Sequence, residues 1–314
     1  MKKLIFGMFL ALSASLVFSA CGDDKDEAPK NIVETAQATA DLSSLVAALS
    51  RAGLVDALNA DGPFTVFAPT NAAFSTFLSA NGFASLEDVP VNVLQQVLLN
   101  HVVSGEFRAA NIPAESYQKT LATFGNTSSN LSILVKSNAS GVSINKDVNV
   151  VTADVLASNG VVHIVDKVIG LPTVVNHALN NDNFSILVTA LTRPSLGVDY
   201  VGILSGAGPF TVFAPTNAAF AALLTELNLT SLDQVDDATL NAVLQYHVVA
   251  GANVLAGQLT NGQVVQTFQT GTFTIDLTSG AKIVDARNRT SNIIITDVQG
   301  SNGVVHAIDK VILP

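Results

Sequence analysis

The chain has 314 residues, with 15 basic and 25 acidic side chains, a formal net charge of −10 and one cysteine. This length favours two domains, and 48% apolar with 13% charged residues excludes a disordered chain. Lysine and arginine are scattered, so no nucleic-acid partner is expected, and a single cysteine excludes a disulfide framework.

The first twenty residues have the pattern of a secretory signal. Lys2 and Lys3 precede an apolar stretch over residues 4–18, and the small residues Ser19 and Ala20 follow it. The apolar stretch is too short and wrongly flanked for a membrane span. We therefore expect residues 1–20 to be a cleaved signal peptide.

Residues 17–21, Val-Phe-Ser-Ala-Cys, resemble a bacterial lipobox. In a lipobox the cysteine is acylated and becomes the new N-terminus, and several acyl chains together anchor a protein stably. Cys21 is therefore the expected lipidation site and the expected contact with the membrane. The alternative is an ordinary cleavable signal followed by an incidental cysteine.

Residues 21–30 are expected to form an acidic tether, since the sequence GDDKDEAPK after the cysteine has nothing to pack. In some Gram-negative bacteria, acidic residues at this place accompany export to the outer face of the outer membrane. The same charges in a linker can also serve solubility alone. We expect a lipid-anchored protein of the outer membrane that faces the cell exterior.

Three motifs occur twice in the chain, which predicts a tandem duplication with domains at 31–170 and 171–314. The longest is identical over thirteen residues in its two copies. The repeated motifs are GPFTVFAPTNAAF at 62–74 and 208–220, Asn-His-Val-Val at 100–103 returning as Tyr-His-Val-Val at 246–249, and SNGVVH at 158–163 and 301–306.

Within one copy, helical patterns precede strand patterns. An amphipathic helix is expected over 42–49, then a buried strand over 64–68, a helix that Thr70 caps, and a helix from Pro90 to His101. β-rich segments follow at 131–136, 142–144, 148–152 and 161–169. Because helices and strands are segregated rather than alternating, the sequence predicts an α+β fold.

The repeated motifs resemble the two signature boxes of fasciclin-type domains. TVFAPTNAAF at 65–74 and 211–220 is similar to the first box, and NGVVHIVDKVI at 159–169, with NGVVHAIDKVI at 302–312, is similar to the second. The resemblance implies that each domain is a compact β-wedge flanked by α-helices. It also implies adhesion or matrix-type binding rather than catalysis.

The resemblance further implies candidate binding residues. In animal relatives, a Tyr-His element and an Asp-Ile dipeptide just before the second box are implicated in receptor binding. The matching residues here are Asp154, Val155, Asp297, Val298, His101, Tyr246 and His247, with Asn100 in place of the first tyrosine and valine in place of isoleucine.

Four of the five histidines recur at matching positions: His101, His163, His247 and His306. No His-x-x-x-His pattern or carboxylate pair lies beside them and no Gly-x-Ser-x-Gly occurs, so we expect no metal site, no cofactor and no catalytic residue. We expect these histidines to be buried and hydrogen bonded. His177, unique to the second copy, is assigned to a linker helix.

Two structural roles are proposed for polar residues that recur in both copies of the repeat. We hypothesise that the second-box histidines hydrogen-bond the first-box turns and so join the two ends of each domain. The hypothesised pairs are His163 with Thr70 and Asn71, and His306 with Thr216 and Asn217. Asp166 and Asp309, each followed by a lysine, are interpreted as edge-strand charges that prevent aggregation.

The sequence therefore predicts a non-enzymatic surface lipoprotein that presents two fasciclin-type modules to an extracellular matrix-type protein or a glycan. Duplication raises the effective concentration of the second binding site once the first is occupied. The alternative is a carrier that holds an apolar small ligand in its Phe- and Leu-rich interior or in the groove between the copies.

Overall fold

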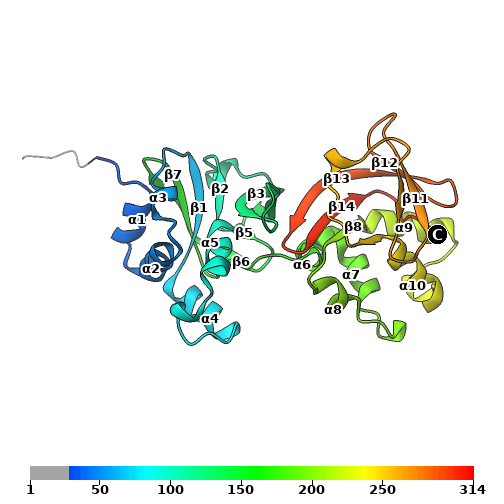
Figure 1. Ribbon diagram of the computed structural model, residues 1–314, viewed down its shortest axis with the longest axis horizontal. Coiled ribbons are helices and arrows are strands. Elements are labelled where there is room, and N and C mark those ends of the chain that lie inside the picture. The colour runs from blue at the N-terminus through cyan, green and yellow to red at the C-terminus, as the bar shows by residue number, and fades with distance from the viewer. Residues whose placement is uncertain (1–27) are drawn as a thin grey trace, which may run out of the picture.

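The computed structural model describes residues 28–314, so the expected signal peptide, Cys21 and most of the expected tether lie outside the described residues. Among the residues it describes, no helix has both the length and the apolar character needed to cross a membrane. The chain forms two domains of the same architecture, arranged along the long axis of the molecule (Figure 1). Both combine helices with one antiparallel-rich sheet, which confirms the α+β prediction.

The first domain has its helices mostly before its strands. Its helices are α1 (Ile32–Ala38), α2 (Ser43–Ala52), α3 (Val55–Leu58), α4 (Asn71–Ala80) and α5 (Val91–Leu99). Its strands are β1 (Phe64–Pro69), β2 (Val102–Ser104), β3 (Glu115–Thr123), β4 (Asn130–Asn138), β5 (Gly141–Ile144), β6 (Val148–Ala157) and β7 (Gly160–Val165). Each strand pairs with the next in sequence, and β7 closes the ring by pairing with β1.

The second domain repeats this order. Its helices are α6 (Val174–Asn180), α7 (Ser185–Leu191), α8 (Tyr200–Ser205), α9 (Asn217–Glu226) and α10 (Asp237–Tyr246). Its strands are β8 (Phe210–Pro215), β9 (Val248–Ala250), β10 (Val264–Gln266), β11 (Thr272–Asp276), β12 (Lys282–Val284), β13 (Thr290–Gly300) and β14 (Gly303–Ile308). The sheet order is β10-β11-β12-β13-β14-β8-β9, so this ring is open between β9 and β10.

Most predicted elements are present. The strand expected over 64–68 is β1, the Thr70 hydroxyl accepts a hydrogen bond from the backbone N–H of Ala73 at 3.1 Å, and α5 follows Pro90. Strand β3 was not predicted because its sequence ESYQKTLAT is largely polar. The last predicted strand, 161–169, ends early, since β7 stops at Val165.

The two signature boxes lie side by side in each domain. Strands β1 and β7 pair in parallel along their whole length. The pairing depends on glycine: a Cβ on Gly160, where φ is +153°, would lie 2.0 Å from the backbone oxygen of Phe64. A Cβ on Gly62 would lie 2.3 Å from the backbone oxygen of Asn159. Any larger residue at either position would separate the strands.

A buried asparagine joins this strand pair to the first helix. Asn159 is 7% exposed, and its Oδ1 accepts a hydrogen bond from the backbone N–H of Ile32 at 2.9 Å. Its Nδ2 donates to the backbone oxygens of Leu58 and Ala60 at 2.8 and 2.9 Å. Asn302 makes the same three contacts in the second domain, with Val174, Leu204 and Gly206.

The carboxylates that follow the second boxes have structural partners. Asp166 accepts hydrogen bonds from the backbone and side-chain nitrogens of Asn149 at 2.7 and 2.8 Å. Asp309 accepts the equivalent pair from Asn292 at 2.7 and 2.6 Å. Strands β7 and β14 each have a neighbour on both sides, so the interpretation of Asp166 and Asp309 as edge-strand charges is wrong.

The two domains are docked through strands β3 and β4 of the first and β13 of the second. The Lys119 ammonium donates to the backbone carbonyl of Asp297 and, at 3.1 Å, to the hydroxyl of Ser132. The same hydroxyl accepts the backbone N–H of Gln299 at 3.0 Å. Burial has the largest influence on the Lys119 ammonium and lowers its pKa. The nearby Asp297 carboxylate acts in the opposite direction and raises that pKa.

Helix α6 completes the docking. The Tyr117 ring packs edge-on against the His177 ring with centroids 6.0 Å apart, and the Tyr117 hydroxyl accepts a hydrogen bond from Asn181 at 3.0 Å. Burial raises the pKa of Tyr117 to about 12. Lys136 and Lys146 pair with Asp182 at 3.0 and 2.9 Å. His177 therefore lies at the domain junction, in the helix that follows the linker.

Replacing Asn159 by alanine is expected to lower the free energy of unfolding by roughly 2–3 kcal/mol, because the N–H of Ile32 and two carbonyls lose their partner. Urea unfolding of both proteins measures the difference. Asn59→Ala is the matched control, since Asn59 is exposed, and its effect should stay within about 0.5 kcal/mol. Equal effects of the two substitutions would contradict the structural role of Asn159.

Candidate functional site

The Asp-Val dipeptide of the first domain lies on an irregular part of β6. The register between β6 and β7 shifts between Thr152 and Val155, and Asp154 has a φ of +58°. The Asp154 carboxylate accepts the backbone N–H of Ala109 at 2.9 Å, and its own N–H donates to Nδ1 of His163 at 3.3 Å. Asp154 is exposed, so its charge is held at the surface in a fixed position.

The dipeptide of the second domain has the same geometry but different surroundings. Asp297 has a φ of +58°, its carboxylate accepts the N–H of Ala256 at 2.7 Å, and its N–H donates to His306 at 3.2 Å. Its carbonyl, however, is bound by Lys119 of the first domain, and Val298 is only 3% exposed. The two copies of the candidate site are therefore not equivalent, because domain docking covers part of the second.

Each second-box histidine accepts a hydrogen bond from the backbone N–H of the aspartate in the dipeptide. Nε2 of His163 lies 2.8 Å from the backbone oxygen of Phe107, and its ring stacks on Phe67 with centroids 5.6 Å apart. Because Nδ1 accepts from Asp154, Nε2 carries the proton and donates. His306 repeats the arrangement with Val254 and Phe213. Both histidines are fully buried, as expected.

The hypothesised bonds from these histidines to the first-box turns are wrong. Both ring nitrogens of His163 and of His306 already contact other groups. The turn residues bind elsewhere: Thr70 and Thr216 cap α4 and α9, Asn71 accepts the N–H of Ser44, and Asn217 accepts the N–H of Ile186. The first-box turn thus joins two helices, and the first box contacts the second through backbone pairing and the stacking of Phe67 on His163.

The histidines of the Tyr-His element are buried. Nδ1 of His101 donates to the backbone oxygen of Val97 at 2.7 Å, and Nε2 accepts the N–H of Ile169 at 2.8 Å. His247 makes the same contacts with Val243 and Ile312. Burial lowers the pKa of each ring to about 4, which keeps both neutral at pH 7.

The residue before each of these histidines is also interior. Tyr246 is 0% exposed, and its hydroxyl donates to the backbone oxygen of Thr272 at 2.6 Å. Asn100, at the matching position, is equally buried and donates to the backbone oxygen of Gly170 at 2.9 Å. The binding role implied for His101, Tyr246 and His247 is therefore corrected, because side chains that are at most 4% exposed offer a partner almost no surface.

Exposed apolar side chains flank Asp154. Val151 and Leu156 are each 57% exposed, and we call these three residues the β6 strip. The matching residue to Val151 is Ile294, which is 51% exposed, whereas the matching residue to Leu156 is Gln299, which is 1% exposed at the junction. The sequence alone did not predict this strip or the junction residues. It showed that Asn159 and Asn302 recur in the repeated motif, but not what they bind.

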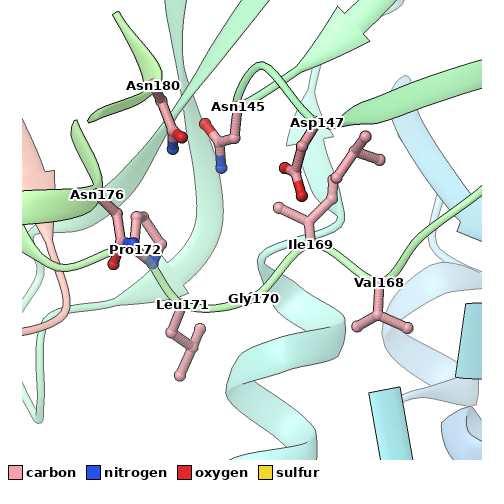
Figure 2. A pocket seen from close by; sticks show the side chains of 10 residues that line it. Asn145, Asp147, Val168, Ile169, Gly170, Leu171, Pro172, Asn176 and Asn180 are labelled. Carbon is pink, nitrogen blue, oxygen red and sulfur yellow. The ribbon is translucent and has the colours of Figure 1, made fainter. Parts of the chain in front are cut away.

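Two hollows of the described residues have room for more than a few water molecules. A polar cavity of about 250 Å³ lies between the two domains (Figure 2). An apolar groove of about 200 Å³ lies beside α9 and α10. Within residues 28–314, no group of three His, Cys, Asp or Glu side chains is arranged to hold a metal ion.

The buried histidines predict acid sensitivity. The pKa values of His101, His177 and His247 are about 4 in the folded chain against 6.5 for a free side chain, so the unfolded chain binds more protons between these values. Their stabilisation is complete above pH 6.5 and is lost as the pH falls to 4, by up to about 3 kcal/mol for each ring.

Urea unfolding at pH 7.0, 5.5 and 4.0 checks this expectation. The variant His247→Gln can still donate to Val243 and accept from Ile312, but it has no proton to take up in this range. Its free energy of unfolding should fall less than that of the natural chain between pH 6.5 and 4. Identical pH dependence of the two proteins would contradict the role of His247.

Comparison with known proteins gives several relatives. An uncharacterised protein of Synechocystis, sll1735, is 38% identical over 143 residues, which are 46% of this chain and 98% of that protein. The transforming growth factor-beta-induced protein ig-h3 of Sus scrofa is 26% identical over 263 residues, 81% of this chain and 35% of that protein. Human periostin is 26% identical over 274 residues, 83% of this chain and 29% of that protein.

A solved structure has a similar fold. The FAS1 domain pair of the insect cell adhesion molecule fasciclin I is similar with a TM-score of 0.53 and 19% identity, over 87% of this chain and 97% of that chain. The fasciclin domain family itself matches residues 40–172 and residues 182–314, one match in each domain. The chain therefore belongs to the fasciclin family and consists of two tandem fasciclin domains.

Proposed function

We propose that this protein is anchored by lipid to the cell surface and binds an extracellular protein or glycan through the β6 strip. Membership of the fasciclin family supports a general role in adhesion or binding, and the matched domain pair comes from a cell adhesion molecule. The family and this neighbour are adhesion modules rather than enzymes. Attachment through Cys21, at the outer membrane and facing outward, rests on the lipobox and the acidic tether.

The observation that carries the proposal is the contrast between the two domains at this surface. In the second domain, the face formed by Asp297 and Gln299 already makes a contact, because the first domain covers it. In the first domain, the matching residues Asp154 and Leu156 are exposed. A surface that binds a protein domain within the chain is thus present a second time, without a partner among residues 28–314 and with a more apolar side chain.

This contrast changes the expected use of the duplication. Two equal sites would act through effective concentration. Because the second dipeptide is partly covered, the proposed binding is instead carried by the first domain. The second domain then serves to support the first, through the contacts of Lys119 and Tyr117.

The alternative function, a carrier of an apolar ligand, is favoured by the groove beside α9 and α10. Its lining includes Phe220, Leu223, Leu227 and Leu240. Its volume of about 200 Å³ is below the roughly 300–1,000 Å³ usual for small-molecule sites. Such a groove accommodates a short apolar group only, so adhesion is the better-supported function.

Replacing Val151 and Leu156 together by serine is expected to weaken retention on an array of matrix proteins and glycans at least tenfold. Both side chains are exposed, so thermal unfolding should stay unchanged. Ile294→Ser, at the position matching Val151, is the control and should bind like the natural chain. Asp154→Asn keeps the acceptor for Ala109 and tests the charge alone. Undiminished binding by the double variant would refute the β6 strip as the site.

Replacing Cys21 by serine is expected to move the exported protein from the membrane fraction to the soluble fraction, because the acyl chains are lost. Intact mass of the natural protein should show a diacylated or triacylated Cys21 at the N-terminus, and protease added to whole cells should degrade it. An unacylated N-terminus, or protection from protease in intact cells, would contradict the proposed anchor or its outward orientation.

A further inference from the structure

We propose that the cavity between the two domains is a binding site for a neutral sugar, independent of the β6 strip. Its walls are the turn between β5 and β6 in the first domain and helix α6 in the second, and linker residues 168–172 form its floor (Figure 2). Its volume of about 250 Å³ is just below the range of drug-sized sites. This volume suits one sugar ring rather than an extended chain.

Three asparagine side chains supply hydrogen-bond donors to the cavity. Oδ1 of Asn145 accepts the N–H of Leu134 at 2.9 Å, and Oδ1 of Asn176 accepts the N–H of Thr173 at 2.9 Å. These bonds show which side-chain atom of each asparagine is the oxygen, and therefore which is the NH₂ group. Neither NH₂ group, nor the side-chain amide of Asn180, donates a hydrogen bond to another described residue. Asn145 is 7% exposed, and Figure 2 shows its side chain and that of Asn180 extending toward the same space.

The backbone fixes these donors in place. Asn145 and Lys146 have φ values of +48° and +71°, and asparagine adopts this region more readily than most residues. The tight turn directs the Asn145 side chain back to β4, where Leu134 holds its oxygen. Asn176 and Asn180 are four residues apart on α6 and so lie on the same face of the helix.

Domain docking holds the two walls of the cavity together. Asp182, just beyond α6, pairs with Lys146 at 2.9 Å and with Lys136 at 3.0 Å. These lysines belong to the β5–β6 turn and to β4 of the first domain. The Lys146–Asp182 pair is exposed and the Lys136–Asp182 pair is exposed on its Asp182 side, so each contributes little stability alone. Together with the buried contacts of Tyr117 they keep the Asn145 wall opposite the α6 wall.

The chemistry of the lining selects a neutral polyhydroxyl ligand. Amide groups donate and accept, and the Asp147 carboxylate only accepts; a sugar hydroxyl does both, so it can match each of them. Asp147, with the net charge of −10 on the chain, disfavours an anion. Its own partner, Lys167, lies 3.3 Å away and compensates it in part, which disfavours a cation.

Saturation-transfer NMR with the full chain tests the proposal, using glucose, galactose, mannose and N-acetylglucosamine as probes. At least one sugar is expected to bind, and Asn180→Ala should raise its Kd at least tenfold without loss of stability. Asn145→Asp keeps the acceptor for Leu134 but removes the donor, and should weaken binding similarly. Asn183→Ala is the matched control: Asn183 is an exposed amide at the same junction, bonded to Glu115 and outside the cavity.

Absence of binding by all four sugars, or unchanged binding by both Asn180→Ala and Asn145→Asp, would overturn the sugar site. The same sugar placed at the end of an array-bound glycan tests whether the ligand is free or glycan-borne, and binding of either form supports the site. The double serine variant of the β6 strip should bind the sugar like the natural chain. Failure of the sugar site therefore leaves the adhesion proposal to be decided by the β6 strip alone.

Discussion

The close parallel pairing of β1 with β7, and of β8 with β14, is the contact on which the rest of each domain depends. Gly62 and Gly160 let the two backbones approach where even a methyl group would collide. The neighbouring Asn159 then extends the contact to the first helix by three hydrogen bonds. Segments from the two ends of the domain meet here, so this contact compensates for the entropy lost in closing the long chain between them.

The same pairing positions the candidate binding surface. Strand β7 has β1 on one side and β6 on the other, so the irregular stretch of β6 lies directly over His163. The imidazole accepts the N–H of Asp154 and donates to the carbonyl of Phe107. The position of Asp154 at the surface is thereby fixed by the buried ring of His163. The position of His163 is fixed in turn by the pairing of β1 with β7. His163 acts on the surface through Asp154 and not by contact with a partner.

The sequence was informative wherever a local pattern decides the structure. Repetition gave the two domains, the apolar run gave β1, and a hydroxyl before a helix gave the Thr70 cap. Hydrogen-bond partners were beyond it: burial requires that His163 be bonded, but several backbone groups of a folded domain satisfy that requirement equally well. The junction was also beyond it, because Lys119 and Tyr117 lie on a mainly polar strand that shows no periodic signal.

The duplication preserved the scaffold and changed the surface, and the junction gives the physical reason. Gln299, at the position of Leu156, is buried at the junction: its backbone N–H bonds Ser132 of the first domain, and its side-chain amide bonds Asn253 and the backbone of Gly303 within the second domain. A leucine there would leave those groups without partners, which costs about 1–3 kcal/mol for each buried group. In the first domain Leu156 is 57% exposed and makes no such contact with the part of the chain that the structure describes, so an apolar side chain is tolerated in water. It becomes favourable only when a partner covers it, since full burial of a leucine contributes about 1.5–3 kcal/mol. The difference between Gln299 and Leu156 is thus what is expected if one face docks within the chain and the other docks outside it.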